Sequence, residues 1–359
     1  MNEQKTKKPM KTRITFYLLS VIIIVLCPIG SVYSQSGDIL DILYSGPEDA
    51  SRYADKYFEP IFKGLGYGFN NGWYNTAKTH QTLGFDFTIS ANLAFVPEGD
   101  NYFKFRNEDF LITELASGAE AETPTLFGPD EMGPMMRVRD ESTGLEIAQF
   151  AGPRGAGLED ELGFQAIPSP IIQVGIGVIK NTDIKLRYIP DVARKDADYS
   201  VWGIGVLHDI GQWIPVIKKA PIDVALFGSF SKLSTTIRFD PIEEFPGINQ
   251  RFSSKINGYT IEALVSKKIS VLTLLAGFGY NSAKTRFDLL GTYNVTYGNP
   301  SLPEDYIIEF EDPIKIDTNE SSARLTGGIR LQFAIVTLHA LYTFNGYNVL
   351  NVGLGFTFR

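Results

Sequence analysis

The carboxy-terminal stretch, residues 321–359, alternates apolar and polar positions through three consecutive runs of strand length. Such alternation predicts β-strands that each have an apolar and a polar face. In the first run Leu325 and Ile329 share the apolar face, whereas Arg324 and Arg330 share the polar one, and His339 lies on the polar face of the second run. A face with two arginines does not fit a dry core. We therefore expect Arg324, Arg330 and His339 to face the lumen of a membrane barrel whose apolar face meets lipid.

The same alternation constrains the loop before the last strand, because a slip of one residue sends every side chain to the wrong face. A two-residue turn at the Asn-Gly pair 345–346 would put Phe344 and Tyr347 on one face, against the pattern. A three-residue loop, residues 344–346, keeps the faces and places Gly346 in the left-handed conformation that such loops need. It pairs Thr343 with Tyr347.

Ten further runs show strand-like patterns: residues 83–95, 102–115, 171–179, 183–189, 199–207, 222–230, 255–267, 270–280, 287–295 and 306–316. The run 83–95 is long enough to cross a bilayer. We predict an all-β protein: an antiparallel transmembrane β-barrel with an even number of strands, about 12–14, closed by pairing residues 83–95 with the last strand. A soluble sandwich or a lipocalin-like barrel is the alternative, with the apolar face turned inward.

The amino terminus has the features of a secretory signal peptide. Five Lys and Arg residues precede an apolar run from Ile14 to Leu26, and small residues follow before Gln35. Because this run is short for a membrane span, we expect cleavage near Ser34 rather than a signal anchor. The single cysteine, Cys27, then leaves with the signal, so disulfides and thiol catalysis are excluded from the mature chain.

A short helix is predicted at residues 47–59. Pro47 suits the first helical position, Glu48 and Asp49 suit the positive end of the helix dipole, and Pro60 is expected to end the helix. This helix either plugs the lumen, caps the periplasmic mouth or packs as an ordinary amino-terminal helix. The predicted organisation is a signal peptide at 1–34, a helical plug or cap at 35–82, and the barrel at 83–359 with a long loop at 116–169.

Charge and chemistry narrow the functional classes. The formal charge is −8, and about −12 without the signal, so nucleic acid is not expected as a partner. The three histidines, His80, His208 and His339, have no second ligand at helical spacing, and no GxSxG motif is present. We assign no catalytic, cofactor-binding or metal-binding residues, leave the ligand-binding residues unknown, expect no cofactor, and do not expect an enzyme.

Four Gly-X-Gly pairs occur within predicted strands, at 175 and 177, 203 and 205, 277 and 279, and 353 and 355. None continues as a phosphate-binding GxGxxG between a strand and a helix. We interpret them as places where the sheet curves or where bulky groups approach the wall closely.

The motifs NGWYNTAKTH at residues 71–80, PTLFG at 124–128 and HDIGQWIP at 208–215 resemble an uncharacterised family of bacterial outer-membrane β-barrel proteins, over about residues 47–359. A plug-like segment before a barrel is more distantly similar to the outer-membrane long-chain fatty-acid transporters. The resemblance implies a location in the outer membrane, in contact with its lipid. A wall with a polar inner face and an amino-terminal helix resembles a plugged transporter, which implies a porin-like channel or transporter for small solutes, hydrophobic ones included. The alternative is a structural or surface-interaction barrel without transport.

Overall fold

The computed structural model describes residues 39–158, 164–189, 197–298 and 305–358. The predicted signal peptide, residues 1–34, lies outside these ranges. Among the described residues, no helix is both long enough and apolar enough to cross a membrane.

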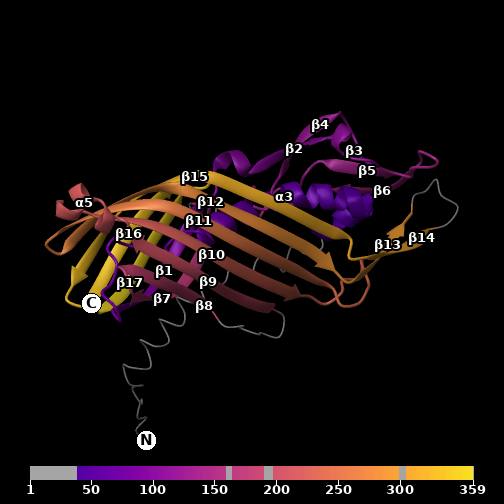
Figure 1. Cartoon of the computed structure of the whole chain (residues 1–359). Helices are drawn as coiled ribbons and strands as arrows, with labels where there is room; N and C mark the ends of the chain where they lie inside the picture. Colours follow the sequence, from indigo (N-terminus) through magenta and orange to yellow (C-terminus); the bar gives the residue numbers. More distant parts are fainter. Residues whose placement is uncertain (1–38, 159–163, 190–196, 299–304, 359) are drawn as a thin grey trace, which may run out of the picture.

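Ten antiparallel strands close into one barrel (Figure 1). Around the circle they follow the order β1, β17, β16, β15, β12, β11, β10, β9, β8, β7, and β7 pairs with β1. The strands are β1 (Phe85–Phe95), β7 (Ala166–Val178), β8 (Thr182–Ile189), β9 (Ala197–Asp209), β10 (Asp223–Arg238), β11 (Arg251–Ile269), β12 (Leu272–Leu290), β15 (Ile314–Phe333), β16 (Val336–Phe344) and β17 (Val349–Phe358). The antiparallel barrel and its closure by β1 and β17 are confirmed. The predicted number of about 12–14 strands is wrong.

Three predicted runs do not form wall strands of their own, which explains the difference. Residues 102–115 form β2 (Tyr102–Arg106), the short 3-10 helix η4 (Asn107–Asp109) and β3 (Thr113–Leu115). Residues 287–295 end β12 and begin β13 (Thr292–Tyr297), whereas residues 306–316 form β14 (Tyr306–Glu311) and the start of β15. Apolar side chains of these segments pack into a core outside the barrel, so their alternation has a cause other than lipid.

The two ends of the barrel differ. At the turn end, short connections join the strands at residues 179–181, 270–271 and 334–335, and η5 (Gly211–Trp213) and α5 (Pro215–Lys219) lie at the rim. At the opposite loop end, β10, β11, β12 and β15 extend beyond their neighbours (Figure 1).

One predicted loop has the wrong length. The register pairs Thr343 with Val349, so five residues rather than three connect β16 to β17. The faces are preserved because the difference is two residues. The longer loop lets the buried Tyr347 turn inward, where its hydroxyl donates a hydrogen bond to Asp100.

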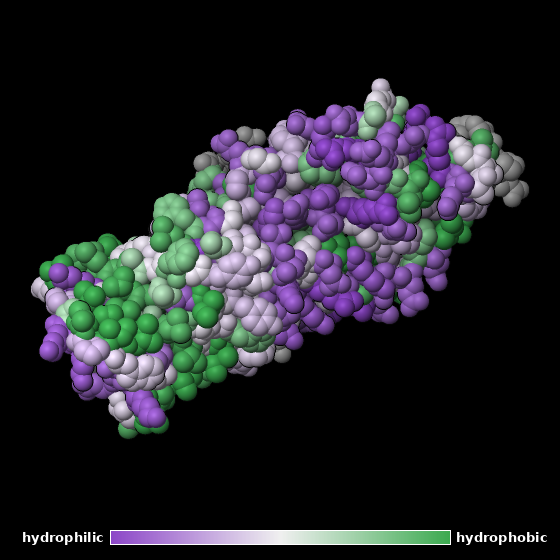
Figure 2. All heavy atoms as spheres, turned by 45° about the horizontal axis from the view of Figure 1, so that its top comes forward, coloured by the Kyte–Doolittle hydropathy of each residue, from purple (hydrophilic) through white to green (hydrophobic). Residues whose placement is uncertain are grey.

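The outward face of the barrel is apolar towards the turn end and polar towards the loop end (Figure 2). On β12 the exposed Leu274, Phe278 and Tyr280 are followed by Lys284 and Arg286. Exposed aromatic side chains lie towards the loop-side limit of the apolar zone: Tyr188, Trp202, Tyr259, Tyr280 and Phe344. Because aromatic rings mark the membrane boundary of transmembrane barrels, the apolar zone is the part that lipid surrounds.

A lobe with its own hydrophobic core stands at the loop end (Figure 1). It consists of η2 (Asp41–Ser45), the first turns of α3 (Gly46–Phe69), η3 (Glu98–Asp100), η4, β2, β3, β4 (Glu120–Pro124), β5 (Met135–Arg139), β6 (Glu146–Ala151), β13 and β14. Tyr53, Phe105 and Val138 are among its fully buried side chains. The predicted loop at 116–169 therefore contains β4, β5 and β6 and the first residues of β7.

Helix α3 is longer than predicted, because it continues through Pro60 to Phe69. Pro60 cannot donate the usual backbone hydrogen bond, which normally breaks a helix. Here the turns on both sides are buried: the rings of Phe58 and Phe62 lie 5.1 and 5.3 Å from the ring of Phe287. Tertiary packing therefore outweighs the local signal of the proline.

Candidate functional site

The chain crosses the lumen immediately after α3, along residues 70–83, which we call the strap. The last turns of α3 already lie between wall strands, since the Cβ position of Gly66 is 2.7 Å from Cβ of Ala283 on β12 and that of Gly68 is 2.6 Å from the Ser169 hydroxyl on β7. At the turn end, the backbone N–H of Leu83 donates to Gly177 on β7 at 2.8 Å. The strap therefore enters at the loop end and leaves at the turn end, where β1 begins.

Two wall arginines hold the start of the strap. Arg187 on β8 donates to the carbonyls of Phe69 at 2.9 Å and Asn71 at 2.7 Å. Arg324 on β15 donates to the Asn70 carbonyl at 3.0 Å and to the Asn71 side-chain oxygen at 2.6 Å. These carbonyls lie at the carboxyl end of α3, where the helix dipole is negative, so cations stabilise that end.

The arginine contacts belong to a larger buried network. Nε of Arg324 lies 3.1 Å from Oε2 of Glu262 on β11, and both side chains are fully buried. The hydroxyl of Tyr74, on the strap, donates a hydrogen bond to the same carboxylate. Because an unpaired charge at this depth is strongly unfavourable, the three groups depend on one another.

Trp73 fills the space between the strap and the wall. The Arg187 guanidinium lies 3.6 Å above its ring, and Gln173 binds both partners through Arg187 Nε and the Trp73 carbonyl, each at 3.0 Å. Cβ atoms at Gly203 and Gly205 would lie 3.0 Å from the indole. These two glycines bear out the interpretation that a bulky group approaches the wall closely there.

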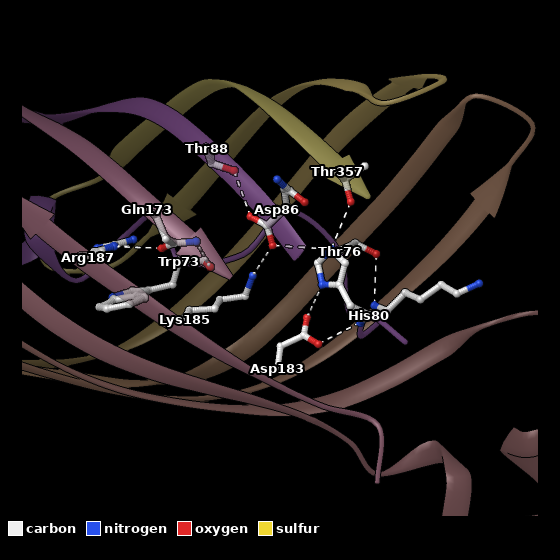
Figure 3. Close-up of polar contacts among 12 residues, drawn as sticks. Trp73, Thr76, His80, Asp86, Thr88, Gln173, Asp183, Lys185, Arg187 and Thr357 are labelled. Atoms are coloured by element: carbon white, nitrogen blue, oxygen red, sulfur yellow. Dashed lines mark hydrogen bonds and ion pairs between the residues drawn. The ribbon is translucent and has the colours of Figure 1, made fainter. Parts of the chain in front are cut away.

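A second polar cluster fastens the strap at the turn end (Figure 3). His80 Nδ1 lies 2.8 Å from Asp183 Oδ2, and the His80 backbone N–H donates to the other oxygen of Asp183 at 2.8 Å. On the opposite side of the ring, Nε2 lies 3.1 Å from the Thr357 hydroxyl and 3.6 Å from Asp86 Oδ1. Asp86 in turn is 3.4 Å from Lys185 Nζ. All five side chains are buried.

The order hydroxyl, imidazole, carboxylate also occurs in nucleophilic hydrolases. Here the cavity beside these residues measures about 10 Å³, which is barely room for one water, and Asn75, Lys78 and Arg330 contribute to its lining. A substrate does not fit in that space. The contacts of this cluster hold the end of the strap against the wall.

Arg324, Arg330 and His339 are buried on the inner face, which confirms the prediction from alternation. His339 Nε2 lies 3.0 Å from the side-chain oxygen of Asn351. His208 lies apart from both other histidines, at the rim, where Nδ1 is 2.8 Å from the Thr182 hydroxyl. Across the described ranges, no three His, Cys, Asp or Glu side chains come together in a way that could hold a metal ion.

The sequence analysis assigned residues 35–82 to a helical plug or cap, but it did not predict that the residues after α3 cross the lumen without helical structure. It also missed the wall partners of the strap, Arg187, Glu262 and Asp183. The alternation could have indicated them. Arg187, Glu262 and Asp183 all lie on the inward, polar face of strands whose outward face is apolar.

An apolar outer zone bounded by aromatic residues, around a polar lumen, defines a transmembrane β-barrel protein. The chain belongs to a family of unknown function (DUF6588), which it matches over residues 10–358. No curated protein matches the chain.

Among solved structures, the chain is similar to the attachment invasion locus protein Ail of Yersinia pestis, with a TM-score of 0.26 and 7% identity over 77% of this chain and 99% of that one. It is also similar to the translocator domain of the autotransporter NalP from Neisseria meningitidis, with a TM-score of 0.26 and 11% identity over 78% and 90%. The outer membrane protease OmpT from Escherichia coli gives a TM-score of 0.26 and 8% identity over 77% and 95%. Scores this low support no argument about function.

Proposed function

We propose that the protein is a gated channel of the bacterial outer membrane for small polar solutes, with the strap as its gate. The observation that carries the proposal is the set of buried ionisable side chains on the lumen wall: Asp86, Asp183, Lys185, Arg187, Glu262, Arg324 and Arg330. Several of them hold the strap directly. Ionisable groups at membrane depth are costly and typically line a path for ions or solutes.

The kind of contact also favours a gate over a permanent filling. Buried ion pairs are often less stabilising than well-packed apolar side chains of the same volume. A lumen that only had to stay full would therefore be filled more stably by apolar residues. Polar contacts such as those of Arg187 and His80 can instead be exchanged for water when the strap shifts, at a small net cost per bond.

The two anchors of the strap limit how it can move. Its first residue follows α3, whose aromatic stripe is packed in the lobe, and its last residue leads into β1 of the wall. The gate therefore opens by rearrangement of the strap inside the lumen, not by its expulsion. The polar lining also favours polar solutes over the hydrophobic ones expected from the distant similarity to fatty-acid transporters.

Conductance in planar bilayers tests the proposal. We expect wild-type protein to conduct little. The double substitution Arg187→Ala and Arg324→Ala removes four of the hydrogen bonds that hold the strap, so we expect frequent openings and a conductance at least about tenfold higher than that of wild type, a loss of roughly 1.4 kcal/mol from the closed state.

The matched control is Arg154→Ala, which removes an arginine that binds Asp130 in the lobe at 3.1 Å. It should leave conductance unchanged. If the double variant folds and bilayers containing it stay as silent as wild type, the strap is not a gate and the channel proposal fails.

A surface-interaction barrel is the second candidate, and the lobe is the observation that favours it. The lobe has a hydrophobic core and stands beyond the apolar zone. In that case binding to a partner would depend on lobe residues, and conductance would not respond to changes in the strap.

A further inference from the structure

Four cationic side chains lie together on the outward face of three neighbouring strands. They are Lys232 on β10, Lys255 on β11, and Lys284 and Arg286 on β12. The register places Lys255 directly opposite Arg286. It also places Lys232 and Lys284 on the two sides of Asn257. We call these four residues the cationic patch.

Such an arrangement is unfavourable for the protein alone. Like charges directly opposite each other on neighbouring strands are destabilising. The chain has 41 acidic residues against 33 basic ones, so carboxylate partners for these lysines are not scarce in the sequence. Arg286 is compensated, because it lies 3.1 Å from Asp288 and opposite Asp317. In the part of the chain that the structure describes, no ion pair joins Lys232, Lys255 or Lys284 to a carboxylate.

The patch lies at a defined height on the barrel. Lys232 is directly opposite Trp202, and Phe230, two residues nearer the turn end, contacts the rings of Trp202 at 5.2 Å and Tyr259 at 5.1 Å. These aromatic residues belong to the boundary between the apolar zone and the polar zone. The cationic patch therefore begins where the hydrocarbon ends, at the depth of lipid headgroups.

We propose that the cationic patch binds the phosphate groups of lipid A in the outer leaflet. The wall below the patch is apolar and accommodates acyl chains, whereas the amines above it supply the charge that a phosphate needs. The flexible stems of the three lysines allow more than one amine to reach the same phosphate. A phosphorylated lipid can place its phosphate at the cationic patch and its acyl chains against the apolar zone, whereas a soluble anion can contact only the patch. The site is on the outer wall and is independent of the strap.

Binding of lipid A to the full-length protein in neutral detergent tests the site. The triple variant Lys232→Gln, Lys255→Gln and Lys284→Gln keeps the side-chain length and removes three charges. Because each basic residue near an anionic lipid surface contributes measurably, we expect affinity to fall roughly a hundredfold. The matched control, Lys219→Gln, Lys267→Gln and Lys268→Gln, removes the same charge at the turn end and should bind like wild type. Native barrel mobility on cold gels verifies that each variant is folded.

Dephosphorylated lipid A provides the second arm. We expect wild type to bind it about as weakly as the triple variant binds intact lipid A. Equal affinities of wild type and triple variant for lipid A overturn the proposal. So does equal affinity of wild type for the two lipids, or an equal loss in the turn-end control.

Discussion

Individual glycines on the inner wall set how closely the strap approaches. Gly205 faces the lumen on β9, and a Cβ atom there would lie 3.0 Å from the Trp73 ring and 3.1 Å from Phe227. Neither ring has room to move, because Trp73 lies against Arg187 and both rings are buried. The indole is thus in close contact with both the wall at Gly205 and the Arg187 guanidinium.

We expect Gly205→Ala to destabilise the protein by about 1–3 kcal/mol, the usual effect of adding a methyl group to a well-packed site. The measurement is urea-induced unfolding in lipid vesicles. The control is Gly327→Ala on the outward face of β15, where nothing lies within 4 Å of the added atom. Equal stability of the two variants would show that the contact between Trp73 and the wall is loose.

At this scale the sequence predicted the direction of side chains but not their partners. Alternation on one strand was enough to place Arg324, Arg330 and His339 in the lumen. It could not show that Arg324 binds Asn70 and Asn71, because those contacts join positions more than 250 residues apart. The strap has no hydrophobic periodicity, so its contacts with the wall cannot be predicted from the sequence pattern of the strap or of the wall strands.

Among the elements, α3 connects the lobe with the lumen. Near its start, the buried carboxylate of Asp49 accepts hydrogen bonds from the backbone N–H groups of Leu111, Ile112 and Thr113, at 2.9 to 3.1 Å. Near its end, the carbonyls are held by the wall arginines. One helix thereby positions both β3 of the lobe and the first residues of the strap.

We expect Asp49→Ala to open the segment from η4 to β3, because three backbone donors would lose their acceptor. The donor of Thr113 is buried, and an unsatisfied buried donor costs about 1–3 kcal/mol. Limited proteolysis of protein in detergent should then cut within residues 107–115 much faster than in wild type. Glu48→Ala is the control, since it removes only an exposed ion pair with Arg52. Unchanged cleavage in Asp49→Ala would mean that other contacts of β3, such as its pairing with β5, hold it without Asp49.

Strands were predictable from sequence where contact with lipid was the only reason for the alternation of apolar and polar residues. The strands that contact lipid outside and polar groups inside were found: β1, β7 to β12, and β15 to β17. The errors arose where packing into the lobe core also shaped the pattern of apolar residues. Residues 102–115, 287–295 and 306–316 contribute apolar side chains to the lobe core, and the aromatic stripe around Pro60 keeps α3 intact. Neither effect can be seen without the tertiary partners, such as Phe287.

The whole molecule is polarised along the barrel axis, with the lobe at one end and short turns at the other. The proposed binding of lipid A in the outer leaflet places the loop end at the cell exterior, because the cationic patch lies on the loop side of the apolar zone. We expect Ser142→Cys, at the exposed tip between β5 and β6, to react with a membrane-impermeant maleimide on intact cells. Lys219→Cys, at the end of α5, should react only after the outer membrane is permeabilised. The reverse pattern of labelling would invert the orientation.

The path of the strap dictates the order of assembly. The lobe contains residues that precede β1, in α3, and residues that follow it, in β2 to β6, whereas β1 pairs with both β7 and β17. Once β1 has paired with β17 the barrel is closed, and a folded lobe cannot pass through its lumen. The sheet must therefore wrap around a strap that is already laid in place, and the pairing of β1 with β17 is the step that closes the ring.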